Sequence, residues 1–153
     1  MKHFFFAILS LFILITAFSC KGKEDSDYIT ERVDSFATHY FNWQYEKCIK
    51  FVKPESKVFI QLAATNVTEE DVQMLRSQQE DASIDIKDFI FEDANHANIK
   101  IAIHNFISVD TTGRKAKSYD YGEAEIRMVK EGKDWYVEMP GALIRTAFLQ
   151  QSE

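Results

Sequence analysis

The sequence predicts an α+β fold, in which N-terminal helices pack on one face of a curved antiparallel sheet. Up to Glu80, apolar residues recur every three or four positions, which is the spacing of one face of an α-helix. After Glu80 they alternate with polar residues, as in strands that are buried on one side. The two patterns occupy separate parts of the chain, and this separation is typical of α+β rather than alternating α/β folds.

The first expected helix has the clearest apolar face in the chain. Asp27 is a suitable residue to cap its N-terminus. The apolar residues that follow at helical spacing are Ile29, Val33, Phe36, Ala37, Tyr40 and Phe41. Residues 42–44 (Asn-Trp-Gln) interrupt this pattern, and a short second helix is expected from Tyr45.

Two further helices are expected before the sheet. Pro54 suits a first helical turn, where its missing N–H group costs nothing. The helix that follows should carry Phe59 and Leu62 on its apolar side. Thr68, with Asp71 three residues later, resembles a capping box and should begin a fourth helix.

Alternation predicts four strands, joined by polar turns. The expected strands are 84–91, 99–109, 119–128 and 135–139. A tight hairpin turn at 131–133 should join the last two strands. Pro140 and Gly141 should end the sheet, so residues 141–153 are expected to form a C-terminal tail.

The N-terminus has the pattern of a secretory signal. Lys2 and His3 precede an apolar run, residues 4–18, that only Ser10 and Thr16 interrupt. As a helix this run would span about 22 Å, less than the ~30 Å hydrocarbon core of a bilayer. A cleaved signal over residues 1–19 is therefore expected rather than a membrane-spanning helix.

The end of this signal resembles the lipobox of bacterial lipoproteins. Ala17 and Ser19 are small residues directly before Cys20. The resemblance implies that Cys20 is the lipid attachment site, with residues 20–26 as a lipidated tether; the alternative is an ordinary signal peptide with an incidental cysteine. Two or three acyl chains would anchor the protein stably.

The residues after Cys20 bear on localisation. By resemblance, Lys21 argues against retention in the inner membrane, so an outer membrane lipoprotein is expected. The sequence Lys-Glu-Asp at residues 23–25 resembles a signal for display on the cell surface. A solvated charged tether explains it equally well, and the periplasmic and surface-facing alternatives stay open.

Charge excludes one class of partner. Removal of residues 1–19 takes away only Lys2, which leaves 17 basic and 24 acidic residues and a net charge of −7. An acidic chain without a basic stripe is a poor candidate for binding nucleic acid. Anionic lipid head groups would also repel it, so the membrane should be held through the N-terminal lipid.

Metal, disulfide and cofactor chemistry are not expected. If Cys20 carries lipid, Cys48 has no partner for a disulfide, and its apolar neighbours favour a buried thiol. His39, His96 and His104 are widely separated and lack the spacing of a zinc site. No glycine-rich phosphate loop is present, so no cofactor is predicted.

Two segments resemble the nuclear transport factor 2-like superfamily, whose domains have a cystatin-like α+β cone. They are FNWQYEKCIKFVKPES (41–56) and EGKDWYVEMP (131–140). The resemblance covers residues 27–140 and implies that the sheet curls around the first helix and leaves a pocket. Several secreted bacterial lipoproteins of unknown function carry such a domain, and the enzymes of the superfamily place an Asp or His in the pocket.

The ionisable candidates for such a pocket have simpler interpretations. His104 alternates with Ile99, Ile101 and Ile103, so it should face solvent if the isoleucines face the helices. His39 lies beside the apolar face of the first helix and is expected at its flank. Asp120 should lie on the face opposite its tyrosine neighbours and is expected on the surface.

Aromatic residues are the better candidates for ligand binding. The residues considered are Tyr40, Trp43, Tyr119, Tyr121 and Tyr136. Tyrosine hydroxyls need a hydrogen-bond partner or water, although most aromatic residues in a domain of this size belong to the core. Trp135 is expected to pack on the first helix.

Two hypotheses of function follow. The first is a non-enzymatic, membrane-anchored lipoprotein whose cone-shaped domain binds a small apolar or amphipathic ligand, or a partner protein. The alternative is an enzyme of the isomerase or dehydratase type that uses a pocket His or Asp. The sequence does not indicate the oligomeric state.

Overall fold

The computed structural model describes residues 25–109, 115–142, 144 and 146–150. The chain divides into two compact units, Met1–Glu31 and Arg32–Glu153. The expected signal peptide, the lipid attachment site Cys20 and most of the tether lie outside the described residues. In the first unit, residues 25–31 are helical, and the Thr30 hydroxyl donates to the Ser26 carbonyl at 2.8 Å. Residue 25 is already helical, so Asp27 lies inside the helix rather than at its N-cap.

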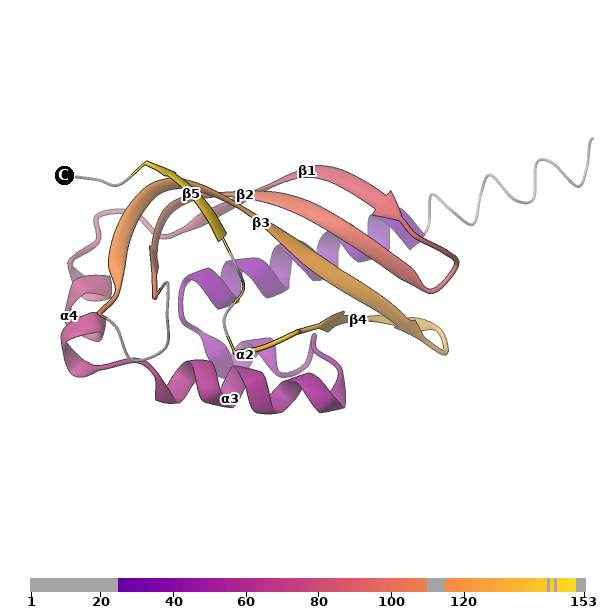
Figure 1. The fold of residues 1–153 in the computed structure, drawn as a ribbon, viewed down its shortest axis with the longest axis horizontal. Coiled ribbons are helices and arrows are strands. Elements are labelled where there is room, and N and C mark those ends of the chain that lie inside the picture. The colour runs from indigo at the N-terminus through magenta and orange to yellow at the C-terminus, as the bar shows by residue number, and fades with distance from the viewer. Residues whose placement is uncertain (1–24, 110–114, 143, 145, 151–153) are drawn as a thin grey trace, which may run out of the picture. The chain divides into compact units, whose positions relative to one another are not determined.

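The α+β prediction is confirmed, with helices before the strands (Figure 1). The first helix covers residues 25–41 of the described chain. The helical elements that follow are α2 (Tyr45–Cys48), the 3₁₀ turn η1 (Pro54–Ser56), α3 (Lys57–Thr65) and α4 (Glu69–Ser77). The strands are β1 (Ser83–Phe91), β2 (His96–Ser108), β3 (Lys117–Glu131), β4 (Asp134–Glu138) and β5 (Thr146–Gln150).

The strands form one antiparallel sheet in which β3 is the central member. The order is β1-β2-β3-β4, and β5 also pairs with β3. The strand β4 pairs with residues 127–131 of β3, and β5 pairs with residues 121–124. Because β2 occupies the other edge of β3, both short strands share one edge. The sheet therefore continues beyond Pro140, into the segment that the sequence predicts to be a tail.

One face of the sheet carries the apolar residues that alternation predicts. Directly paired residues share a face, and the buried residues of β2 and β3 on this face are Ala97, Ile99, Ile101, Ile103, Ala124, Ile126 and Met128. In β1 the register shifts between Ile86 and Asp88. This bulge adds one residue, so Phe89 and Phe91 lie on the same face as Ile86.

The second part of the first helix packs on this face. Val33, Phe36 and Phe41 are buried, and the Phe41 ring meets the Phe106 ring edge-on with centroids 5.6 Å apart. At the edge of the sheet, Val137 donates its N–H to Phe51 and accepts from the Lys53 N–H, at 2.9 and 3.0 Å. These bonds join the segment after α2 to β4, so helices and sheet share one core.

A Schellman motif follows the first helix, with Trp43 as its left-handed residue. The Trp43 N–H donates to the Tyr40 carbonyl at 3.1 Å, and the Gln44 N–H donates to the His39 carbonyl at 2.8 Å. Trp43 has φ 56°, a conformation that favours glycine. Its indole Nε1–H donates to the Ile107 carbonyl at 3.1 Å, so the side chain fixes the end of the helix to β2.

The expected capping box of α4 is present. The Asp71 N–H donates to the Thr68 hydroxyl at 3.2 Å, and the Thr68 N–H donates to the Asp71 carboxylate at 2.9 Å. The other carboxylate oxygen of Asp71 accepts the Ala116 N–H at 3.0 Å. Asp71 is only 1% exposed. Through these hydrogen bonds its carboxylate both caps α4 and joins α4 to the residue before β3.

Candidate ligand-binding groove

A groove of about 530 Å³ opens beside the shared edge of β3. We call it the edge groove. Its lining comes from η1, α3, three strands and the segment after β4. The residues are Lys53, Glu55, Ser56, Phe59, Asn98, Glu125, Ile126, Arg127, Val137, Glu138, Met139, Pro140 and Ile144.

The groove lies where two strands leave part of β3 uncovered. The strand β4 pairs with β3 up to Arg127, and the pairing with β5 ends at Ala124. Glu125 and Ile126 pair with neither of them, although both pair with β2 on the other edge. The chain that connects β4 to β5 contributes Met139, Pro140 and Ile144 to the lining.

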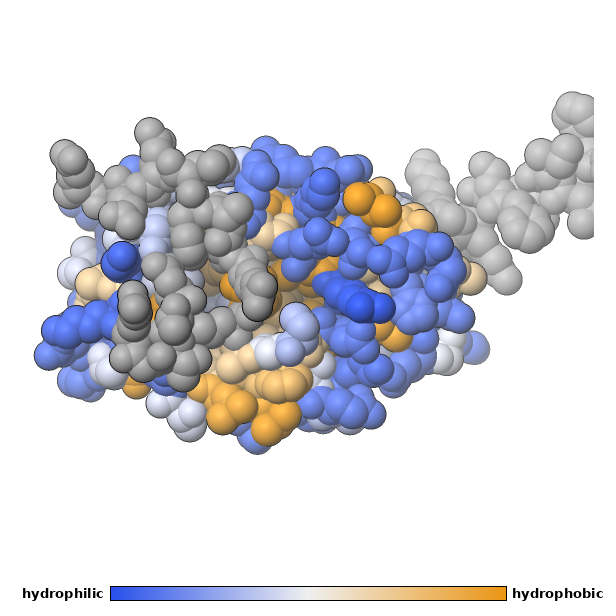
Figure 2. Space-filling model, in the orientation of Figure 1, coloured by the Kyte–Doolittle hydropathy of each residue, from blue (hydrophilic) through white to orange (hydrophobic). Residues whose placement is uncertain are grey.

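Apolar side chains form much of the groove and continue onto α3. Phe59 lines the groove, and its helix also carries Val58 and Leu62, which are 49% and 50% exposed. Figure 2 shows an apolar surface over α3 that continues toward β4. We call Val58, Phe59 and Leu62 the α3 strip. Exposed aliphatic side chains beside an apolar groove are typical of a surface that binds a partner or ligand.

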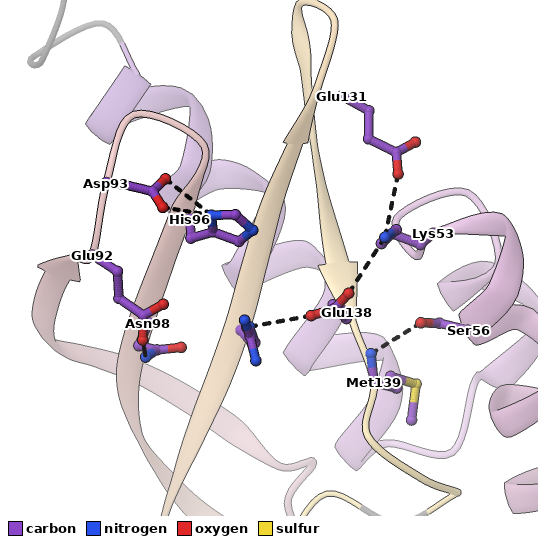
Figure 3. Close-up of polar contacts among 10 residues, drawn as sticks. Lys53, Ser56, Glu92, Asp93, His96, Asn98, Glu131, Glu138 and Met139 are labelled. Atoms are coloured by element: carbon purple, nitrogen blue, oxygen red, sulfur yellow. Dashed lines mark hydrogen bonds and ion pairs between the residues drawn. The ribbon is translucent and has the colours of Figure 1, made fainter.

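Two cations and two carboxylates form a chain of ion pairs, the ion-pair cluster, at one end of the groove. The Lys53 amine lies 3.4 Å from Glu131 and 3.3 Å from Glu138, and Figure 3 shows it between these two carboxylates. The second oxygen of Glu138 pairs with Arg127 Nε at 3.1 Å. The hydrogen bond to Glu138 raises the pKa of Lys53, which remains a cation at neutral pH. The cluster has no net charge.

Backbone hydrogen bonds hold the segment that follows β4. The Met139 N–H donates to the Ser56 hydroxyl at 3.0 Å, and both residues are buried (Figure 3). The Tyr40 hydroxyl donates to the Ala142 carbonyl at 3.2 Å and accepts from the Ile144 N–H at 3.1 Å. The wall that carries Pro140 and Ile144 is therefore attached to both η1 and the first helix.

Of the five aromatic candidates, Tyr40 is bonded to this wall in the part of the chain that the structure describes. Tyr40 is buried and bonds to the wall through its hydroxyl, although it does not line the groove. Trp43 lies with Tyr40 around a small internal cavity of about 20 Å³, which is room for a single water molecule.

The other three aromatic candidates lie apart. Tyr119 is buried and stacks on Phe106 with ring centroids 5.4 Å apart. The Tyr121 hydroxyl donates to Glu123 at 2.8 Å, and this bond raises the pKa of Tyr121. The ring of Tyr136 packs against the Arg32 guanidinium at 5.2 Å.

The ionisable candidates also lie outside the groove. His104 is 37% exposed through its side chain and lies 3.2 Å from Asp85 and edge-on to the Tyr121 ring. His39 Nδ1 lies 3.0 Å from Gln44 Oε1, and the amide oxygen is the acceptor in this contact. Asp120 is exposed and lines a shallow polar depression with Asn105. Cys48 is buried, and burial raises the pKa of its thiol to about 12.

Two further findings concern metal binding and membrane-spanning helices in the described residues. Among them, no three His, Cys, Asp or Glu side chains are placed to hold a metal ion. No helix within the described ranges is both long and apolar enough to cross a membrane.

The sequence pattern does not single out the groove residues. It predicts Phe59 on the apolar side of a helix and Val137 within the last expected strand, and core residues occur at the same kinds of position. The signal that could have drawn attention to α3 is the sequence VFIQL, residues 58–62, in which apolar residues extend around more than one helical face. No family model matches the chain, and the comparisons with curated proteins and with solved structures also give no match.

Proposed function

We propose that this protein is a lipid-anchored component of the bacterial outer membrane whose α+β domain binds a small amphipathic ligand in the edge groove. The anchor is proposed from the sequence that surrounds Cys20. The binding function is proposed from the groove, and one observation carries it. A cavity of about 530 Å³ with several apolar lining residues lies within the size range of small-molecule sites, about 300–1,000 Å³.

The ionisable side chains of the lining favour ligand binding over catalysis. A general base needs an ionisable group that is desolvated and within reach of a substrate proton. Lys53, Arg127 and Glu138 are instead held in mutual ion pairs, and Glu55 and Glu125 are exposed. The isomerase or dehydratase alternative therefore has less support than ligand binding.

We also propose that the domain belongs with the nuclear transport factor 2-like cones. The support is the residue pattern at 41–56 and 131–140, together with helices packed on one face of an antiparallel sheet. In Figure 1, β2 and β3 bend along their length, as strands of a curled sheet would. The edge groove would then be the opening at the incompletely paired edge of that cone.

The proposal can be tested with a neutral fluorescent probe, N-phenyl-1-naphthylamine. The protein should carry Cys20→Ala and lack residues 1–19, so that neither an acyl chain nor the apolar signal competes for the groove. We expect saturable binding with enhanced fluorescence, and Phe59→Gln should weaken it about tenfold or more, because a ring contact with the ligand is lost. Phe91→Gln is the matched control, since Phe91 is an exposed ring on β1 outside the groove.

An NMR titration of the Cys20→Ala protein keeps the test independent of the Phe59 variant. The probe should shift the backbone amide signals of Ile126 and Val137, which line the groove. Absence of saturable binding, or equal weakening by Phe59→Gln and Phe91→Gln, would contradict the proposed function.

A further inference from the structure

We propose that the natural ligand of the edge groove carries a cationic group next to its apolar body. This inference rests on the proposed function and specifies the chemical class of its ligand. It comes from the charges of the groove lining, counted after the ion pairs between protein side chains have been taken into account.

The basic side chains of the groove are already neutralised. Lys53 shares its charge between Glu131 and Glu138, at 3.4 and 3.3 Å. Arg127 pairs with Glu138 at 3.1 Å. An anionic ligand would have to compete with carboxylates that the fold holds in place, and each displaced carboxylate would lose its partner.

Two acidic side chains of the lining have no such partner. Glu55, in η1, and Glu125, in the uncovered part of β3, line the groove and are exposed. Neither makes an ion pair or side-chain hydrogen bond within the described part of the chain. The ion-pair cluster is neutral when Glu131, which does not line the groove, is counted with it, so Glu55 and Glu125 bring the groove and this cluster together to a net charge of −2.

The shape of the site suits a molecule with two different parts. The alkyl or aromatic body can contact Phe59, Pro140 and Ile144, and extend along the α3 strip. The cationic group can then approach the carboxylates of Glu55 and Glu125. The whole chain, with a formal net charge of −6, adds a long-range attraction for cations.

The expected preference for a cationic over an anionic amphiphile can be estimated from the strength of exposed ion pairs. Each such pair strengthens binding by about 1.4-fold to fivefold, and salt weakens it. Together, two carboxylates should favour a cationic amphiphile over its anionic counterpart by about threefold to tenfold at low salt. The apolar body would supply most of the affinity.

The test compares amphiphiles of one chain length by isothermal titration calorimetry below their micelle concentrations. The probes are dodecyltrimethylammonium, dodecanoate and a neutral C12 alcohol ethoxylate, with the Cys20→Ala protein. We expect the trimethylammonium probe to bind about threefold to tenfold more tightly than dodecanoate at about 0.03 M salt. The difference should shrink at about 0.5 M salt, where the Debye length is a few ångströms.

A pair of charge-matched variants assigns the preference to the groove. The double variant Glu55→Gln with Glu125→Gln should abolish most of the preference and leave binding of the neutral probe unchanged. The control double variant is Glu46→Gln with Asp81→Asn, which removes two exposed carboxylates outside the groove. It should retain the preference.

The possible outcomes separate this inference from the proposed function. Equal or tighter binding of dodecanoate would overturn the cationic ligand and leave the amphipathic groove in place. The same loss in both double variants would also overturn it, because the preference would then reflect total charge. Failure of all three C12 probes to bind would overturn both proposals.

Discussion

Tyr40 and Ile144 lie 104 residues apart in the sequence and are joined by a hydrogen bond of 3.1 Å, from the Ile144 N–H to the Tyr40 hydroxyl. The same hydroxyl donates to the Ala142 carbonyl at 3.2 Å. Burial raises the pKa of Tyr40 to about 12, so the hydroxyl keeps its proton at neutral pH and can make both bonds. The first helix thus holds the segment that forms one wall of the edge groove.

Tyr40→Phe should therefore weaken both the fold and the groove. Two hydrogen bonds disappear, and each typically contributes about 1 kcal/mol, so unfolding in urea should require about 1–2 kcal/mol less free energy. Binding of N-phenyl-1-naphthylamine should also weaken, because Ile144 lines the groove.

Tyr136→Phe is the matched control for Tyr40→Phe. The Tyr136 hydroxyl makes no hydrogen bond within the described chain, and its ring would keep the contact with Arg32. We expect a change in stability of no more than about 0.5 kcal/mol. Comparable effects of the two variants would mean that the Tyr40 hydroxyl does not hold the wall.

Trp43 provides a second test, because its backbone and side chain have opposite effects. The left-handed backbone costs about 1 kcal/mol for a residue with a Cβ atom, whereas the side chain packs against the cluster of Ile107, Val109 and Ala116 and bonds to the Ile107 carbonyl. Both Trp43→Ala and Trp43→Gly should lower stability. The Gly variant should be the more stable of the two, by about 1 kcal/mol.

The control for Trp43 is the same pair of substitutions at Gln61. This residue is exposed in the middle of α3, where glycine should be less stable than alanine by about 1 kcal/mol. Thermal unfolding of the four variants shows, at each position, whether the Ala or the Gly variant is the more stable. If alanine were more stable than glycine at both positions, the left-handed backbone at Trp43 would not determine how much stability its substitution loses.

The helices and most strands could be predicted because they depend on local spacing. The apolar face from Val33 to Phe41 and the alternation from Ile99 to Ile103 required only neighbouring residues, and all of these apolar side chains are buried. Asn105 shows where local spacing stops being sufficient. Its φ of 52° interrupts the alternation, so that His104 is half exposed and Phe106, two residues later, is fully buried.

The groove could not be predicted because it depends on pairing between distant segments. It exists because β4 and β5 share an edge of β3, and β5 is a five-residue strand beyond a Pro-Gly sequence that normally ends a sheet. The aromatic candidates follow from residue type alone, which does not show where a side chain lies in the fold. Tyr119 and Tyr121 illustrate the difficulty, since one is buried in the core and the other is bonded to Glu123 on the surface side.

The N-terminal anchor is tested by Cys20→Ala. If Cys20 carries the acyl chains, the variant should lose incorporation of a fatty-acid analogue and should leave the membrane fraction or remain uncleaved. Cys48→Ala is the control, because Cys48 is buried and should not be acylated. Equal labelling of wild type and Cys20→Ala would reject the lipoprotein proposal without affecting the groove.

Asp71 should make the stability of the domain depend on pH in the acid range. Burial alone would raise its pKa, but hydrogen bonds from the backbone N–H groups of Ala116 and Thr68 outweigh burial and lower it below the ordinary value of 3.8. The ionised carboxylate is therefore favoured in the folded state. Its contribution is complete above the unfolded pKa and is lost as the pH falls through the folded pKa.

Asp71→Asn should remove this dependence. At pH 7 the variant should be less stable by about 1–3 kcal/mol, because an amide replaces a carboxylate that accepts from Ala116 and Thr68. The difference from wild type should narrow as the pH falls below about 4, where the wild-type carboxylate begins to lose its advantage. Asp81→Asn, at an exposed position, controls for the lost charge, and urea unfolding from pH 7 to about 3 measures all three proteins. A gap between wild type and Asp71→Asn that stays constant over this range would show that the carboxylate acts through its shape alone and that its charge contributes nothing to the junction of α4 with β3.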